Sequence, residues 1–156
     1  MVITPRIRNN ICLTAHPAGC AAEVKRQIDY VKGNGAIQGT RSALIIGSST
    51  GYGLSCRVAA AFGCGASTIG VFFEKAGAEN RPGTPGYYNM KAFDREAAEA
   101  GLFSKSINGD AFSNKLKQET IEAIKEGPGK VDLVIYSLAS GVRVDPADGI
   151  MYRSAL

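Results

Sequence analysis

The chain alternates between short apolar runs and longer segments in which apolar residues recur every three or four positions. Three runs, residues 43–46, 68–73 and 131–136, are mostly apolar, rich in β-branched residues, and lack the polar alternation of a strand that faces water. Such strands are buried on both faces, as in a parallel sheet covered by helices. Residues 104–107 form a weaker strand candidate, placed by its position in the order. We expect Tyr136, inside the last run, to belong to the core.

Amphipathic helices are predicted between these runs and before them. Residues 52–62, 87–100 and 112–125 carry apolar residues at helical spacing, and an earlier helix is expected over residues 21–32. A short extended segment, residues 2–14, precedes it. Because each crossover is long enough for a helix, the right-handed crossover rule favours an α/β fold. We predict a Rossmann-like, doubly wound parallel sheet of strand order 3-2-1-4 with helices on both faces.

The whole chain has the length of one domain. We expect residues 1–156 to form one dinucleotide-binding domain, with residues 1–40 as an N-terminal extension and helix packed on it. Residues 74–87 are rich in Gly, Pro and charge, and we interpret them as a long loop because periodicity resumes on either side. The last sheet strand would have an unpaired apolar edge. The sequence therefore predicts an apparently truncated domain.

A glycine-rich segment joins the first sheet strand to the helix that follows it. It reads Gly47-Ser48-Ser49-Thr50-Gly51-Tyr52-Gly53. Glycines let the backbone turn sharply and approach a pyrophosphate, while the free N–H groups and positive end of the helix dipole point at it. The hydroxyls of Ser48, Ser49 and Thr50 can add hydrogen bonds to phosphate oxygens. The segment predicts a dinucleotide pyrophosphate site.

An acidic residue follows the second sheet strand, where such folds bind a ribose. Glu74 lies about 20 residues past Gly53, and a carboxylate there accepts hydrogen bonds from the adenosine ribose and repels a 2′-phosphate. The pattern favours NADH over NADPH.

Two further loops belong to the same end of the predicted sheet. After the third strand, Asp110 either faces the adenine amine or caps the next helix, with Ser113 as a competing cap. After the fourth strand, small residues at 137–141 either let the chain pass the nicotinamide ribose or form an ordinary loop.

Composition excludes several other classes of protein. The net charge of +4 mildly favours anionic ligands, but the basic residues are dispersed and no aromatic platform accompanies them, so we expect no nucleic-acid partner. The four cysteines form no Cys-x-x-Cys pair, and the single histidine, His16, cannot complete a zinc set, so we expect no metal site. We assign His16 to the start of the first helix.

The chain lacks a signal-like or membrane-spanning apolar run, and we expect a cytoplasmic protein without a membrane partner.

A tyrosine and a lysine have the spacing of a reductase active site. Tyr87 and Lys91 are four residues apart on one predicted helix face, as in short-chain reductases. They follow the second strand, on the adenosine side, whereas a tyrosine that protonates substrate must stand near the nicotinamide. We therefore assign no catalytic residue in this chain.

Taken together, the motifs resemble the N-terminal portion of the FabV-type trans-2-enoyl-CoA/enoyl-acyl-carrier-protein reductases. Nearly the whole chain is covered. The segments that carry the resemblance are Pro5-Arg6-Ile7-Arg8, His16-Pro17-Ala18-Gly19-Cys20, Gly47 to Leu54, Gly70-Val71-Phe72-Phe73-Glu74, Asn108-Gly109-Asp110-Ala111-Phe112-Ser113, residues 131–140 and Arg153-Ser154-Ala155-Leu156.

The resemblance implies a bacterial, NADH-dependent enzyme of fatty acid synthesis that reduces the 2,3 double bond of an acyl thioester of CoA or acyl-carrier protein, and a monomer at full length. Hydride goes to the β-carbon, and a tyrosine with a nearby lysine stabilises and protonates the enolate. The family's cofactor positions carry over onto Gly47, Ser48, Ser49, Thr50, Gly51, Tyr52, Phe73, Glu74, Asp110, Ala111, Leu138 and Ala139.

The family's catalytic Tyr-x8-Lys pair is implied to lie beyond residue 156. No such pair occurs in the chain: the residues nine positions after its tyrosines are Gly39, Ala61, Glu96, Ala97 and Asp145, and Tyr152 has none. We expect the chain to supply the cofactor-binding half and to be inactive alone. Two alternatives stay open, a non-catalytic NADH-binding module and an S-adenosylmethionine-dependent methyltransferase, which also pairs a glycine loop with an acid after the second strand.

Overall fold

The computed structural model describes residues 5, 7–9, 11–12, 14–79 and 81–155. The extended segment predicted over residues 2–14 is thus described only in part, where β1 (Ile7–Arg8) and β2 (Ile11–Cys12) pair antiparallel. Arg6 and Leu156, which belong to the motifs of the resemblance, lie outside the described residues, as does position 80 of the predicted loop.

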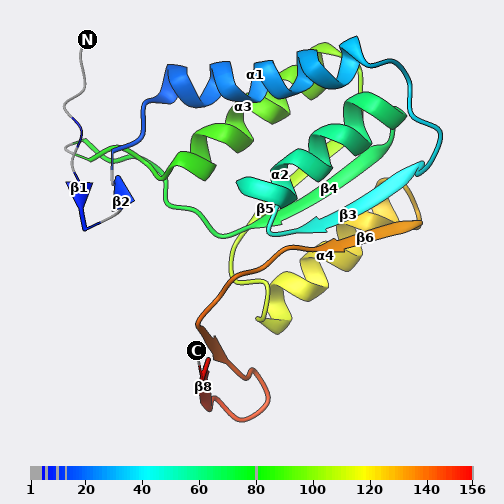
Figure 1. The fold of residues 1–156 in the computed structure, drawn as a ribbon. Helices are drawn as coiled ribbons and strands as arrows, with labels where there is room; N and C mark the ends of the chain where they lie inside the picture. The colour runs from blue at the N-terminus through cyan, green and yellow to red at the C-terminus, as the bar shows by residue number, and fades with distance from the viewer. Residues whose placement is uncertain (1–4, 6, 10, 13, 80, 156) are drawn as a thin grey trace.

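Four parallel strands form the central sheet. They are β3 (Ser42–Ile46), β4 (Ser67–Phe72), β5 (Ser104–Asn108) and β6 (Leu133–Tyr136), and their order is β5-β4-β3-β6 (Figure 1). Numbered along the sheet strands alone, this is 3-2-1-4. The predicted Rossmann-like topology is confirmed, and so is the weak strand candidate at residues 104–107.

Helices cover both faces of the sheet, as predicted. One face carries α1 (Pro17–Gly33), α2 (Gly51–Val58), its π-helical continuation η1 (Ala59–Gly63) and α3 (Pro85–Glu99), and the other carries α4 (Asn114–Glu126) (Figure 1). The first helix starts earlier than predicted because His16 Nδ1 accepts a hydrogen bond of 3.0 Å from the Gly19 N–H and Pro17 suits the first turn. The assignment of His16 to the helix start is confirmed.

The N-terminal helix belongs to the main core. Val24 and Ile28 of α1 are fully buried and pack with Met90 and Phe93 of α3. The second core, on the other face, joins the sheet to Leu116 of α4. Residues 17–33 therefore pack against the rest of the chain through the main core.

A buried arginine explains why β5 is polar. The Arg57 side chain is fully buried, and its Nη2 and Nη1 atoms each donate a hydrogen bond of 2.9 Å, to Ser104 Oγ and Ser106 Oγ respectively. Its guanidinium carbon lies 4.3 Å from the centroid of the Phe93 ring. Burial lowers the pKa of Arg57 to about 10, against the opposing attraction of Asp94. The two serines are thus inward-facing hydrogen-bond partners rather than signs of a loop.

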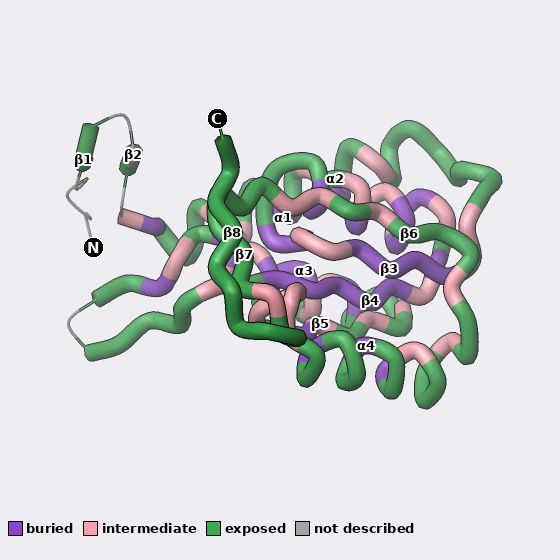
Figure 2. Tube along the Cα trace, turned by 90° about the horizontal axis from the view of Figure 1, so that it is seen from below, coloured by how far each residue is buried: buried purple, intermediate pink, exposed green. Residues whose placement is uncertain are grey.

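The strand β6 departs from its prediction. Val134 is 57% exposed and Tyr136 63% exposed, so the expected burial of this strand on both faces is wrong, and so is the placement of Tyr136 in the core. The cause is that β6 pairs only with β3 among the described residues, which leaves its outer edge open. Figure 2 shows the contrast between β6 at the margin of the sheet and the buried strands β3 and β4.

A second hairpin follows the sheet. The strands β7 (Val142–Val144) and β8 (Met151–Arg153) pair antiparallel, and they project from the end of β6 (Figure 1). This hairpin was not predicted. None of the helices formed by the described residues is both long and apolar enough to span a bilayer.

Candidate functional site: a pocket at the carboxyl ends of the strands

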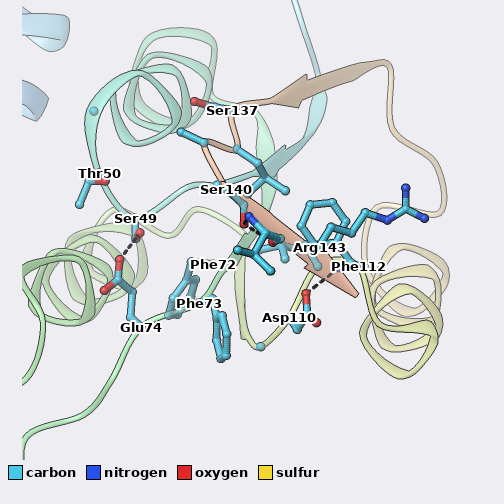
Figure 3. Close-up of a pocket in the computed structure, with 18 of the residues that line it drawn as sticks. Ser49, Thr50, Phe72, Phe73, Glu74, Asp110, Phe112, Ser137, Ser140 and Arg143 are labelled. Carbon is cyan, nitrogen blue, oxygen red and sulfur yellow. Dashed lines mark hydrogen bonds between the residues drawn. The ribbon is translucent and has the colours of Figure 1, made fainter. Parts of the chain in front are cut away.

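A pocket of about 550 Å³ opens where the four parallel strands end. Its floor is the point between β3 and β6 at which the strand order reverses, where open α/β sheets bind their ligands. Loops after all four strands and the hairpin strand β7 contribute to it (Figure 3). Of the predicted cofactor residues, those that line it are Gly47, Ser49, Thr50, Gly51, Tyr52, Phe73, Glu74, Asp110, Ala111, Leu138 and Ala139.

The glycine-rich turn forms one wall of the pocket. Gly47 has a φ of +90°, and a Cβ there would overlap the Ser137 carbonyl group at the end of β6. Gly51, the first residue of α2, has a φ of +52°, and no atom of the described residues lies within 4 Å of the place its Cβ would take. The start of α2 therefore faces open space, as a phosphate-binding helix end requires.

The three hydroxyls of this turn point in different directions. The Ser48 side chain is fully buried, and its hydroxyl donates to the Val71 carbonyl oxygen at 3.2 Å. Ser49 donates to Glu74 at 2.6 Å. Thr50 is the N-cap residue of α2, and its side chain caps no helical N–H in the part of the chain that the structure describes. The expected phosphate contact through the Ser48 hydroxyl is therefore wrong in this geometry, because that hydroxyl faces the core. Thr50 stays a candidate donor.

Glu74 lies where the sequence placed it, and it is held by several contacts. Its Oε1 atom accepts the Ser49 hydrogen bond across the pocket rim (Figure 3). A Cβ on Gly86, in the first turn of α3, would overlap this carboxylate. The Asn108 side chain bonds both backbone groups of Glu74, each at 2.9 Å. Asn89 of α3 in turn donates to the Ser49 carbonyl oxygen at 3.0 Å.

Neither Asn89 nor Asn108 was predicted to have a role in the site. Asn108 stands at the end of a strand directly before Gly109 and Asp110, and a polar residue at that place was the available signal. Nothing local in the sequence distinguishes Asn89 from other polar residues of α3.

Asp110 lies in the turn before α4, on the side of the pocket opposite the glycine-rich turn. Its Oδ1 atom accepts a hydrogen bond of 2.9 Å from the Phe112 N–H, and Ser113 is the N-cap that accepts from the Leu116 N–H. The alternative in which Asp110 caps α4 is therefore wrong, and the competing cap is used. Asp110 and Ala111 both line the pocket, and Figure 3 shows Asp110 there. Their contact with an adenine stays a prediction.

An arginine of the hairpin was not predicted. The Arg143 guanidinium carbon lies 5.8 Å from the centroid of the Phe112 ring, and its Nη2 atom pairs with Asp145 at 2.7 Å. Tyr87 and Lys91 contact each other, with Nζ 5.7 Å from the ring centroid, but they do not line this pocket.

Two family models match this chain. Residues 2–79 match the model of the NAD(P)H-binding domain of trans-2-enoyl-CoA reductase, and residues 81–156 match the model of the catalytic region of the same enzyme. The chain belongs to the trans-2-enoyl-CoA reductase family. The resemblance inferred from the motifs is confirmed.

Relatives and solved structures agree with this assignment. The chain is 58% identical to an enoyl-[acyl-carrier-protein] reductase [NADH] of Flavobacterium johnsoniae and 59% identical to one of Yersinia pestis, each match covering the whole chain. The crystal structure of Treponema denticola trans-2-enoyl-CoA reductase in complex with NAD superimposes with a TM-score of 0.94 at 51% identity, over 100% of this chain and 41% of that one. The chain thus spans 39% of the length of these two relatives.

Proposed function

We propose that this reductase-family chain binds NADH in the pocket at the carboxyl ends of its strands. The observation that carries the proposal is the open N-terminus of α2, where Gly51 leaves room for a pyrophosphate that a side chain would fill. The residues fit a dinucleotide because the neighbouring carboxylate, Glu74, stands on the same rim.

Each end of the pocket would hold a different part of the cofactor. The N–H groups of Gly47 and Ser48 donate to the Val71 carbonyl oxygen, so residues 49–52 would bind the pyrophosphate through backbone N–H groups and the Thr50 hydroxyl. Glu74 would accept hydrogen bonds from the adenosine ribose. Asp110 and Ala111 would contact the adenine, and the exposed ring of Phe73 would cover it. Leu138 and Ala139 would border the nicotinamide ribose. When bound, NADH supplies the hydride for a reduction.

The whole protein would reduce the 2,3 double bond of trans-2-enoyl thioesters of CoA or acyl-carrier protein in fatty acid synthesis, as a cytoplasmic monomer. The names of its relatives support this substrate class. The family also favours reduction over the methyltransferase alternative. In this chain no tyrosine is followed nine positions later by lysine, so the 156 residues would position the cofactor and not protonate the substrate.

The test of binding is a calorimetric titration of the 156-residue chain with NADH, with S-adenosylmethionine as the counter-ligand. We expect NADH to bind and S-adenosylmethionine to give no heat of binding. Gly51→Ala places a methyl group in the cradle and should weaken NADH binding at least about ten-fold, a free-energy loss of ~1.4 kcal/mol.

Gly101→Ala is the matched control, because Gly101 also has positive φ and no neighbour within 4 Å among the described residues but lies in the turn after α3. Its affinity for NADH should equal that of the wild type. Equal losses in both variants would overturn the cradle at Gly51. Oxidation of NADH by the isolated chain with crotonyl-CoA, abolished by changing one of its own tyrosines, would overturn its proposed inactivity.

A further inference from the structure

The side chain of Asn108 forms two hydrogen bonds with the backbone of Glu74. Its Oδ1 atom accepts a hydrogen bond from the Glu74 N–H, and its Nδ2 atom donates to the Glu74 carbonyl oxygen, both at 2.9 Å. An amide side chain that bonds both groups of one residue substitutes for a paired strand. Because both contacts are made to the main chain, they constrain the backbone on either side of the Glu74 Cα.

This contact begins where the regular pairing of β4 with β5 stops. The last Cα pair of the two strands is Phe72 with Asn108, and the Gly109 N–H then donates to the Phe72 carbonyl oxygen at 2.8 Å. Residues 73 and 74 lie beyond β4. Without Asn108, Glu74 would begin a long glycine-rich loop with no strand partner, and its side-chain direction would be free to vary.

A second contact holds the side-chain carboxylate of Glu74. The Ser49 hydroxyl, which is largely buried, donates to Glu74 Oε1 at 2.6 Å. Asn89 holds the Ser49 carbonyl oxygen, so the donor itself is anchored to α3. Glu74 Oε2 accepts no hydrogen bond from the described residues, which leaves one carboxylate oxygen for a ligand hydroxyl.

We infer that Asn108 and Ser49 are specificity-determining positioning residues: they hold the Glu74 carboxylate at one place on the pocket rim, and this placement sets the preference for NADH over NADPH. The inference rests on the proposed NADH site. Neither residue needs to touch the cofactor ribose for this role.

The positioning role has a signature that a merely structural role lacks. A fixed carboxylate strengthens binding of a ribose that carries a free 2′-hydroxyl and repels one that carries a 2′-phosphate. Releasing Glu74 therefore weakens NADH binding but relieves the repulsion of NADPH. A general loss of structure would weaken both dinucleotides together and leave the ratio of their dissociation constants unchanged.

The experiment measures dissociation constants for NADH and NADPH by calorimetry on the 156-residue chain and on Asn108→Ala and Ser49→Ala. We expect the NADPH-to-NADH ratio of dissociation constants to fall about five-fold or more in each variant, the effect of roughly one lost hydrogen bond. If Asn108→Ala does not fold, Asn108→Ser replaces it, since serine already occupies two positions of β5 and cannot reach both backbone groups.

Asn34→Ala is the control, because Asn34 also donates its side-chain N–H to a backbone carbonyl, that of Tyr30, but at the end of α1. The NADPH-to-NADH ratio of dissociation constants of Asn34→Ala should equal that of the wild type. A ratio unchanged in the Asn108 and Ser49 variants, with NADH still bound by the wild type, would overturn this inference alone. Failure of the folded wild type to bind NADH would overturn the proposed function and the inference with it.

Discussion

Gly53 of α2 packs directly against the backbone of Gly47 at the end of β3. A Cβ at residue 53 would overlap the Gly47 carbonyl group, so the helix can approach the sheet this closely only without a side chain there. The third glycine of the motif thus acts in packing, while Gly51 faces the pocket. Close approach of helix and strand brings the helix N-terminus over the strand end.

We predict that Gly53→Ala destabilises the chain by about 1–3 kcal/mol, because the added methyl group must displace backbone. Urea unfolding followed by far-UV circular dichroism measures this. Gly33→Ala, at a helical glycine with no neighbour within 4 Å among the described residues, should be neutral or slightly stabilising. Equal stability of the two variants would contradict the packing role of Gly53.

Replacing the buried Arg57 by lysine should lower the free energy of unfolding. Its guanidinium forms hydrogen bonds with Ser104 and Ser106 at once and lies over the Phe93 ring, which a single ammonium group cannot do. We expect Arg57→Lys to cost about 2–4 kcal/mol of unfolding free energy, since the hydroxyls of two strand residues lose their donor. Chemical denaturation measures it.

The comparison for this prediction is Arg26→Lys on the exposed surface of α1, where the arginine pairs with Glu23. No measurable change in stability is expected there, because water and salt screen exposed ion pairs. A neutral Arg57→Lys variant would show that the network around β5 contributes little.

Some features of the fold and of the site follow from the sequence, and others do not. The strands and helices follow from periodicity within a few residues, and the glycine turn and Glu74 follow from fixed positions in a Rossmann unit. Arg57 and Asn89 form hydrogen bonds with residues about 50 and 40 positions away along the chain, so no local pattern predicts these contacts. The exposure of β6 depends on what lies beside it, which the apolar composition of the strand does not encode.

Asp132, the residue before β6, forms side-chain hydrogen bonds with the start of β3. Its carboxylate accepts hydrogen bonds from the Thr40 hydroxyl and from the N–H groups of Arg41 and Ser42. These hydrogen bonds lower the pKa of Asp132 from 3.8 to about 2. A folded-state pKa below the unfolded one means that the stabilisation is complete above about pH 4 and is lost as the pH falls toward 2.

We therefore expect Asp132→Asn to lower the melting temperature by a constant amount between pH 5 and pH 7, and this difference from the wild type to shrink between pH 4 and pH 2. Thr40→Val removes the hydrogen bond that lowers the pKa of Asp132 most, so the acid loss should start at a higher pH than in the wild type. A difference that does not vary with pH down to 2 would exclude this linkage.

Glu74 itself should decide between the two dinucleotides. Glu74→Ala removes both the ribose acceptor and the charge that opposes a 2′-phosphate, so the preference for NADH should fall by about ten-fold or more. Titration with both dinucleotides measures it. Glu79→Ala, in the same loop and exposed, should keep the wild-type preference. An unchanged preference in Glu74→Ala would refute the assignment of Glu74 to the ribose.

The open edge of β6 should make the isolated chain self-associate. Val134 and Tyr136 expose apolar surface on a strand whose outer edge pairs with no other strand of the described residues, a combination that favours edge-to-edge pairing of strands. We expect the sedimentation coefficient of the 156-residue chain to rise with concentration, and Val134→Lys to abolish this rise because a charge at the edge opposes pairing. Tyr30→Lys, at a 70% exposed position on α1, should associate like the wild type. If both lysine variants sediment alike at all concentrations, β6 is not the associating edge.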